Sequence, residues 1–432
     1  MTVAVVGAGL AGLACASLLA ESGCEVEVFE ADERVGGRVL SVPDPSGDAW
    51  ELGAQVIHSD GVPALARFGA VGVPPERTDL AIVLDGRPVR SWQLMARGIR
   101  PWQATAGLTG VGGSVARWID DACPTSTARR VAHDWVSQEW ACGTDALDAG
   151  ETARWLTDRS AAGAAGLVIP AGLNSLTDRL TAGLTIHLAQ PVDEVVVSPT
   201  GTGIRTGATS TATDAVVVTV PPWLLRAPGE RGGLVLRGVD PVALRTVAGM
   251  PGGDAVAVLI TLRRPVPTSA NVFDRRFGFV RCRRGSTRIL AVSKGPGAAA
   301  LRTAVNDPVP LTAALCAVLG LPNAGGVPAD VRVVDWGRRP WTRGAFSAPT
   351  AQQRAARGAL RSLERGGLVF AGEATRRDGT AARMHGALSS GVDAANRMLT
   401  WLGRSRPPSR DGIPAARPIG AATGGITLGG ST

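Results

Sequence analysis

Apolar residues along the chain alternate between short continuous runs and stretches with helical spacing. The first run, Thr2 to Val6, leads into Gly7-Ala8-Gly9-Leu10-Ala11-Gly12 and then into apolar residues at helical spacing: Leu10, Leu13, Ala14, Leu18 and Leu19. This order predicts a buried strand, a tight turn and a helix. A second run from Val26 to Phe29 predicts a neighbouring strand that ends at Glu30.

The three glycines of the first turn fit a dinucleotide-binding loop. Gly7 permits the turn, Gly9 lets the backbone approach a pyrophosphate at the helix N-terminus, and Gly12 lets the helix lie close to the strand. Glu30 is placed to accept a hydrogen bond from an adenosine ribose hydroxyl, and its charge would repel a 2′-phosphate. The pattern therefore favours FAD or NAD over NADP.

Two further glycine-containing segments follow. The charged loop Asp32 to Arg38 contains Gly36 and Gly37, which allow close backbone approach to a ligand, and Arg38 can supply a guanidinium to a phosphate. For this loop alone, an ordinary surface turn is the simpler interpretation. In the segment 50–58, a short strand leads into a Gly53-Ala54 turn, where main chain can pass against a flat ligand.

From about Leu80 the pattern changes and predicts an inserted domain. A hairpin is expected at 81–84 and 88–90 around Asp85-Gly86, followed by helices at 104–121, 128–140 and 151–162. Six tryptophans in this region are more simply interpreted as core than as a binding site, because each buries a large apolar area. They are Trp92, Trp102, Trp118, Trp135, Trp140 and Trp155.

The second half of the chain repeats this alternation. A helix at 172–183 and strands at 185–188 and 194–197 precede a continuous apolar strand at 214–220, which is typical of a buried parallel strand in the first sheet. A second sheet and its helix are expected at 254–262, 277–281, 286–292 and 310–319. A last strand at 368–373 and a long helix at 382–402 complete the pattern.

Composition narrows the class of protein. With 432 residues the chain is expected to form two domains, and its 45% hydrophobic share is normal for a globular protein. The net charge of +8 is scattered, so it indicates solubility and no nucleic-acid partner. Six widely spaced cysteines indicate neither zinc nor a disulfide framework, and Cys15 is expected to be a buried filler. The early first strand leaves no room for a signal peptide, and no apolar run is long enough to span a membrane, so a cytoplasmic location is expected.

Taken together, the motifs resemble the flavin-containing amine oxidase superfamily, which includes monoamine, polyamine and L-amino-acid oxidases, with phytoene desaturases and protoporphyrinogen oxidase as more distant relatives. The matching segments span residues 2 to about 398 in the family's order: VAVVGAGLAGLACASLLAESG, EVEVFEADERVGGRV, WELGAQVIH, IPAGLNSLTDRL, VDEVVV, DAVVVTVPP, DWGRRPWTRGAFS and LVFAGEATRRDGTAARMHGALSSGVDAANR.

The resemblance implies an α/β fold in which a Rossmann-like FAD-binding domain is interleaved with an α+β substrate domain. The expected FAD-binding domain consists of 1–80, 165–232 and 341–403, and the substrate domain of 81–164 and 233–340. The tail at 404–432 is rich in Pro, Gly, Ser and Thr and is expected to be disordered.

The resemblance also implies which residues hold FAD. The expected contacts are Gly7, Gly9, Leu10, Ala11, Gly12, Glu30, Ala31, Gly36, Gly37, Arg38, Gly53, Ala54, Val192, Gly372, Glu373 and Met384. Adenine is expected beside the backbone of Val192, and Glu373 near the ribityl chain and pyrophosphate. The Met384 N–H is expected to face the flavin pyrimidine, where a helix N-terminus stabilises negative charge.

The chain departs from the family pattern on the substrate side. The lysine common in related oxidases falls at Ala257, and Lys294 is expected to lie too far along the chain to replace it. Of the two family aromatics, one matches Phe346 and the other falls at Arg383, which favours an anionic substrate over a cationic amine. The cysteine that binds flavin covalently in some members falls at Ala345, so FAD is expected to be non-covalent.

The leading functional hypothesis is an FAD-dependent oxidoreductase that removes a hydride from a C–N or C–C bond of a small organic substrate, with O2 or another electron acceptor as the second reactant. Trp341 and Phe346 are expected as pocket walls, Arg383 as an anion contact, and His58 or His385 as a polar partner, although either histidine could simply satisfy backbone groups. No catalytic residue is assigned beyond the candidates His58, Phe346, Arg383 and His385. Alternatives are a desaturase or tailoring oxidase of a biosynthetic intermediate, a flavoprotein with a non-catalytic partner-binding role and, for the first motif alone, a nicotinamide-dependent dehydrogenase.

Overall fold

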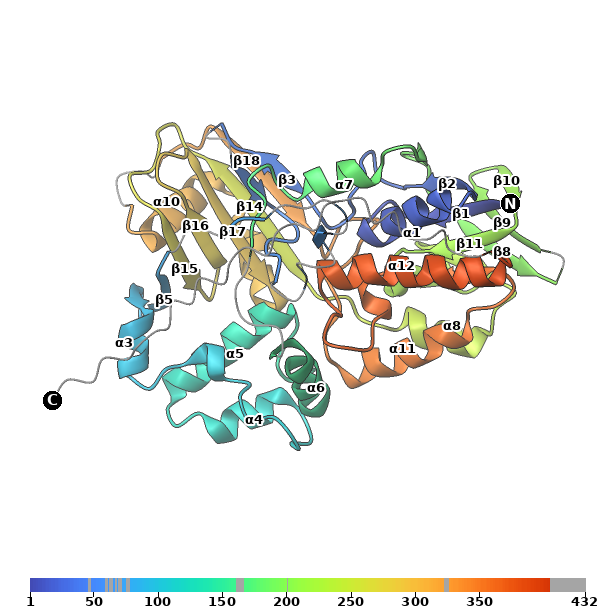
Figure 1. Ribbon diagram of the computed structural model, residues 1–432. Coiled ribbons are helices and arrows are strands. Elements are labelled where there is room, and N and C mark those ends of the chain that lie inside the picture. Colours follow the sequence, from blue (N-terminus) through green and yellow to red (C-terminus); the bar gives the residue numbers. More distant parts are fainter. Residues whose placement is uncertain are drawn as a thin grey trace.

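The computed structural model describes residues 1–404 except 46–47, 59–60, 62–64, 67, 69–71, 75–77, 161–166, 200 and 322–325. Its larger sheets occupy two halves of the molecule, with α1 and α12 on one half and α10 on the other (Figure 1). This arrangement confirms the predicted α/β class. The division into domains by residue number stays a prediction.

The first sheet is parallel throughout and has the strand order β19-β11-β1-β2-β7. Its strands are β1 (Thr2–Val6), β2 (Glu25–Phe29), β7 (Thr185–His187), β11 (Ala215–Val218) and β19 (Leu368–Phe370). The predicted returns of the chain to this sheet are confirmed, since β11 pairs directly with β1 and β19 pairs with β11. In a parallel sheet all carboxyl ends lie at one edge, which is where ligands bind in open α/β folds.

Alternate residues of β1 divide the core between two layers. Val3 and Val5 pack against α1 (Leu10–Glu21) and α12 (Met384–Trp401). Ala4 and Val6 belong to the opposite core layer, which also contains residues of α8 (Pro241–Ala248), α11 (Ala351–Ser362) and a second sheet. The two covering helices lie side by side in Figure 1. Gly391 makes this approach feasible, because a Cβ there would lie 2.2 Å from the carbonyl oxygen of Ala11.

The second sheet has the order β10-β9-β8-β13-β12. It packs in the core layer that contains Ala4 and Val6 of β1. Its strands are β8 (Glu194–Ser198), β9 (Gly201–Thr206), β10 (Thr209–Thr213), β12 (Leu225–Arg226) and β13 (Leu234–Arg237). The β9–β10 hairpin was not predicted, because its polar Thr-rich strands have no apolar run.

The third sheet has seven strands in the order β18-β14-β17-β16-β15-β5-β6. They are β5 (Leu80–Leu84), β6 (Arg87–Arg90), β14 (Ala255–Thr261), β15 (Ala270–Asp274), β16 (Gly278–Cys282), β17 (Arg288–Lys294) and β18 (Asp330–Asp335). One face packs on α9 (Ala298–Ala304) and α10 (Pro308–Val318) through residues such as Val258 and Ala291. The opposite face includes Ala257 and Val292 and turns toward Trp50 and Leu52.

The inserted helices are α4 (Val115–Ala122), α5 (Ser126–Trp140) and α6 (Ala149–Ser160). The predicted helix at 104–121 is wrong in its first half, because Gly107, Gly110 and Gly113 all have positive φ and α4 begins only after the Ser114 cap. Trp140 and Trp155 are buried as predicted, whereas Trp92 on α3 (Ser91–Ala96) and Trp102 are 60% and 37% exposed, so their assignment to the core is wrong.

The remaining described elements connect these layers. They are β3 (Ser41–Pro43), β4 (Ala49–Glu51), α7 (Asn174–Leu180) and four short 3₁₀ helices. Among the described helices, none combines the length and the apolar character that a membrane crossing requires. Of the tail predicted to be disordered, residues 405–432 lie outside the described part of the chain.

The close contact between α1 and α12 predicts that a glycine-to-alanine substitution destabilises the protein in α12, whereas the same substitution in α11 stabilises it. Gly391→Ala should lower the free energy of unfolding by about 1–3 kcal/mol, because the added methyl group overpacks the contact with Ala11. Gly358→Ala should raise it by about 0.5–1 kcal/mol, because Gly358 lies at an exposed position of α11 where an added Cβ meets no atom within 4 Å. Urea unfolding of both variants measures the difference, and equal effects would contradict the close-contact argument.

Candidate functional site

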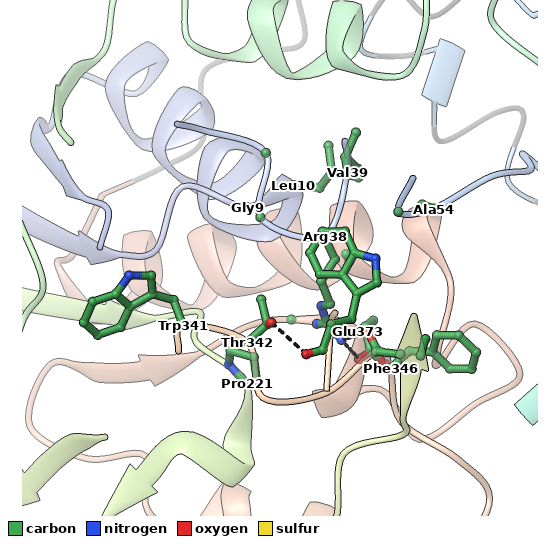
Figure 2. A pocket seen from close by; sticks show the side chains of 18 of the residues that line it. Gly9, Leu10, Arg38, Val39, Ala54, Pro221, Trp341, Thr342, Phe346 and Glu373 are labelled. Carbon is green, nitrogen blue, oxygen red and sulfur yellow. Dashed lines mark hydrogen bonds and ion pairs between the residues drawn. The ribbon is translucent and has the colours of Figure 1, made fainter. Parts of the chain in front are cut away.

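A cavity of about 1120 Å³ begins at the carboxyl ends of the first sheet and extends to the inner face of the third. It is larger than the roughly 300–1,000 Å³ usual for a site that holds one drug-sized ligand. Figure 2 shows Gly9 and Leu10 from the first turn, Arg38 and Glu373 near the centre, and Phe346 and Trp341 on opposite sides of that pair. The cavity can therefore hold an extended ligand with room beyond it.

The glycines of the first turn have distinct structural roles. Gly7 has φ of +105°, and a Cβ on Gly12 would lie 1.9 Å from the Gly7 carbonyl oxygen, so Gly12 serves the packing of helix on strand. Gly9 lines the cavity, and a Cβ there would meet no protein atom within 4 Å. The open space beside Gly9, at the N-terminus of α1, is where a pyrophosphate would fit.

Glu30, at the end of β2, is held by two backbone groups. Its Oε2 accepts a hydrogen bond from the Ala8 N–H at 2.7 Å, and its Oε1 accepts one from the Asp32 N–H at 2.8 Å. Burial raises the pKa of Glu30, although these hydrogen bonds act in the opposite direction. The carboxylate lines the cavity and retains lone pairs that can accept a ribose hydroxyl.

The double-glycine loop is fixed beside the first turn. Arg34 donates hydrogen bonds to the carbonyl oxygens of Val35 and Val39, both at 2.9 Å, and also to that of Gly37. The Gly36 N–H donates to the Ala8 carbonyl oxygen at 2.8 Å. The loop is thus a built part of the cavity wall rather than a surface turn.

The centre of the cavity wall is the ion pair between Arg38 and Glu373, whose Nη1 and Oε1 atoms lie 2.8 Å apart. Arg38 Nη1 also donates to the Ala345 carbonyl oxygen at 2.7 Å. Glu373 Oε2 accepts from the Ser347 hydroxyl at 2.6 Å and the Ala382 N–H at 2.9 Å. Burial alone would raise the pKa of Glu373, but the Arg38 charge and these hydrogen bonds hold it below its usual value, so the carboxylate is ionised.

A second helix N-terminus faces the same cavity. α12 begins at Met384 after Arg383 in an extended conformation, and Arg383, Met384 and Ala387 all line the cavity. The N-termini of α1 and α12 therefore bring two partial positive charges to one ligand site.

The structure brings almost all the predicted cofactor residues together. The cavity lining includes Gly7, Gly9, Leu10, Ala11, Glu30, Ala31, Gly36, Gly37, Arg38, Gly53, Ala54, Val192, Gly372, Glu373 and Met384. Gly12 lies behind the lining. The individual contacts that these residues make with a cofactor stay predictions.

The predicted substrate-side residues are more dispersed. His58, Phe346 and Arg383 line the cavity, whereas His385 is 5% exposed behind it and packs against Gly61. Trp341 also lines the cavity, but it is 43% exposed and lies across the Arg38–Glu373 pair from Phe346 (Figure 2). Trp341 and Phe346 are therefore not facing walls of one small pocket.

Sequence reasoning missed the residues that line the far end of the cavity. These are Trp102, Trp135, Glu139, Trp140, Phe279, Arg281 and Lys294. Lys294, which was expected to lie too far along the chain to replace the family lysine at position 257, nevertheless reaches the cavity. β17 pairs with β14 so that Lys294 lies opposite Ala255, two residues from Ala257, and both Ala255 and Lys294 line the cavity. Alternation within the predicted strand 277–281 was the available signal for Phe279 and Arg281, whereas the sequence favours a core role for the three tryptophans.

Comparison with known proteins agrees with this architecture. A protein-family model described as flavin containing amine oxidoreductase matches residues 10–89 and 126–399. A solved structure of a putrescine oxidase triple mutant superimposes with a TM-score of 0.74 at 20% identity, covering 93% of this chain and all of that one.

Similarity in sequence is more local. The Mycobacterium tuberculosis protein AofH, named as a flavin-containing monoamine oxidase, is 36% identical to this chain over 148 residues. This segment is 32% of each protein. A zeta-carotene desaturase of Synechocystis sp. is 50% identical over 56 residues, which is 13% of this chain and 12% of that protein. The chain thus spans about a third or less of the length of these curated relatives.

The fold and the cavity are typical of proteins that bind an extended dinucleotide cofactor. The chain belongs to the flavin-containing amine oxidoreductase family, whose model matches well over half of it. FAD is the family's cofactor, and the open space at Gly9, the two helix N-termini and the acceptor Glu30 fit it.

The ion pair at the centre of the wall predicts a pH-dependent loss of stability. Glu373→Gln should lower the free energy of unfolding of the apoprotein at pH 7 by about 3 kcal/mol, because Arg38 is left without its charge partner. Since the folded-state pKa of Glu373 is depressed, its contribution is present above the unfolded value and is lost as pH falls through the folded one.

The gap between wild type and Glu373→Gln should therefore shrink below about pH 4. Urea unfolding from pH 7 to pH 3 measures it, with Glu33→Gln, at an exposed position of the loop that also contains Arg38, as the matched control. A gap that stays constant down to pH 3 would contradict the assigned role of the carboxylate charge.

Proposed function

We propose that the protein is an FAD-dependent oxidoreductase that removes a hydride from a C–N or C–C bond of a small organic substrate. The observation that carries the proposal is one continuous cavity with two unlike ends. One end has a glycine turn, two helix N-termini and Glu30, and the other has aromatic walls on the inner face of the third sheet. A cofactor fits the first end and leaves the second for a substrate.

The chain's own residues would act by binding and orientation. Gly9 and the start of α1 would receive the pyrophosphate, Glu30 the adenosine ribose, and the Arg38–Glu373 pair would hold the wall beside the middle of the cofactor. FAD, when bound, supplies the hydride acceptor. Since Ala345 stands where some relatives have a cysteine, we expect the cofactor to be held without a covalent bond.

Aromatic side chains at the far end would exclude water from the substrate. Phe346 and Phe279 line this end together with Trp135 and Trp140. A dry site strengthens electrostatic interactions and prevents side reactions. Arg383, which lines the same cavity at the start of α12, favours an anionic substrate over a cationic amine. Electrons would then pass to O2 or to another acceptor.

A desaturase or tailoring oxidase acting on a C–C bond is the second candidate. It is favoured by the predominantly apolar walls of the far end and by alanine at position 257. The charged groups at that end fit a pure hydrocarbon poorly, which favours a substrate with a polar group. A non-catalytic flavoprotein would show no substrate-dependent reduction at all.

The space beside Gly9 yields a test of cofactor binding. Gly9 has φ of −75° and ψ of 176°, which valine also adopts, and no protein atom lies within 4 Å of an added Cβ. Gly9→Val should therefore leave the apoprotein folded but reduce FAD affinity at least about tenfold, because the side chain occupies the pyrophosphate space. Titration of apoprotein with FAD, followed by flavin absorbance and circular dichroism, measures both, and unchanged affinity would contradict the assignment.

Anaerobic reduction of the bound flavin tests the reaction itself. Purified protein should be yellow, and candidate amines, amino acids and polyenes should be mixed with it in the absence of oxygen. Loss of the visible flavin absorbance is expected with an organic substrate that carries an anionic group. A protein that takes up FAD but is bleached by none of these classes would favour the non-catalytic alternative.

A further inference from the structure

Two cationic side chains, Arg281 of β16 and Lys294 of β17, line the far end of the cavity. Along β16 and β17, alternate side chains face the cavity, namely Phe279 and Arg281 on one strand and Val292 and Lys294 on the other. The residues that alternate with them along the strands, such as Val280 and Ala291, face the helices on the other side of the sheet. Strand periodicity therefore places both cations on the cavity face.

Neither cation forms a close ion pair with a carboxylate of the described residues, although Glu139 lines the same cavity and favours the charged form of Lys294. Within the described part of the chain, no carboxylate oxygen lies within 4.0 Å of the charged nitrogens of Arg281 or Lys294. Arg281 Nε donates to Asn271 Oδ1 at 3.2 Å, which leaves the terminal N–H groups of a five-donor guanidinium for a ligand. Lys294 Nζ lies 5.4 Å from the centre of the Phe346 ring.

Holding two cations partly buried in the wall of one cavity is costly without an anion to contact them. Burial lowers the pKa of Lys294 to about 8, with Glu139 opposing the shift and Arg281 adding to it. Burial also lowers the pKa of Arg281, and Arg283 adds to that shift. The arrangement is typical of a site that is completed by a negatively charged ligand.

We propose that Arg281 and Lys294 form the seat for a carboxylate group of the substrate, whose apolar body lies against Phe279 and Phe346. The proposal rests on the function proposed above, because it assigns the substrate end of the same cavity. It replaces Arg383 as the main anion contact with two residues of the third sheet. Arg281 supplies paired N–H donors, and Lys294 supplies a single charge.

Binding of a carboxylate should depend on the protonation of Lys294. Affinity should be full below the Lys294 pKa of about 8 and should weaken as pH rises through it. Other charged or titratable groups also face this region, and their contributions are the same in wild type and in the Lys294 variants. They are His58, Glu139, Arg281 and Arg383 in the main cavity, and His133, Asp134, Asp145 and Arg275 in a smaller cavity of about 230 Å³ that Lys294 also lines.

Calorimetric titration of the FAD-loaded protein with three matched probes tests the seat without requiring turnover. The probes are phenylacetate, neutral phenylacetamide and cationic phenethylamine. Phenylacetate should bind most tightly, and its affinity should fall by about tenfold or more in Lys294→Met and in Arg281→Met. Lys294→Arg should retain most of the affinity, and the exposed Arg284→Met on the same hairpin should match wild type.

From pH 7 to pH 9 the affinity of wild type for phenylacetate should weaken, and this slope should be absent in Lys294→Met. Wild type that binds phenethylamine or phenylacetamide as tightly as phenylacetate overturns the proposal, even if the methionine variants fail to fold. Selective carboxylate binding without reduction of the flavin by any substrate would instead overturn the proposed redox function and leave the seat standing.

Discussion

The buried ion pair between Arg38 and Glu373 joins two segments that lie 335 residues apart in the chain. It lies where the loop after β2 meets the turn after β19, and it organises Ser347, Ala345 and Ala382 around it. Its cost in desolvation is offset by hydrogen bonds to both carboxylate oxygens of Glu373 and by the bond from Arg38 to Ala345. The start of α12 and the first glycine turn therefore face one cavity from fixed positions.

Alternation within strands determines what each sheet contributes to that cavity. In the first sheet, both faces are buried and only the strand ends reach the ligand site, so the main chain and the helix N-termini provide the contacts. In the third sheet, one face packs on α9 and α10 and the other is available to a ligand, so side chains provide the contacts. A backbone-lined end suits a cofactor common to many proteins, and a side-chain-lined end suits a substrate that differs between them.

Much of the first sheet could be predicted from sequence because its signals are local. Thr2 to Gly12 and the run ending at Glu30 combine apolar strands, glycines and an acceptor within short segments. The position of Lys294 could not be predicted, because the pairing of β17 with β14 depends on contacts between segments far apart in sequence. The helix start at Val115 was missed because helical spacing outweighed three glycines whose positive φ only the tertiary structure reveals. Likewise, the exposure of Trp92 depends on which elements cover α3.

Lys294 is also the only lysine in the chain. Its side-chain amine, with a pKa of about 8, is uncharged at mildly alkaline pH to a far greater extent than an ordinary lysine, and the uncharged amine is the nucleophile. Apart from the terminal α-amino group, a reagent that acylates or alkylates amines would meet one target, and that target lies on the wall of the ligand cavity. The rate at which Lys294 is labelled should therefore report on whether the cavity is filled.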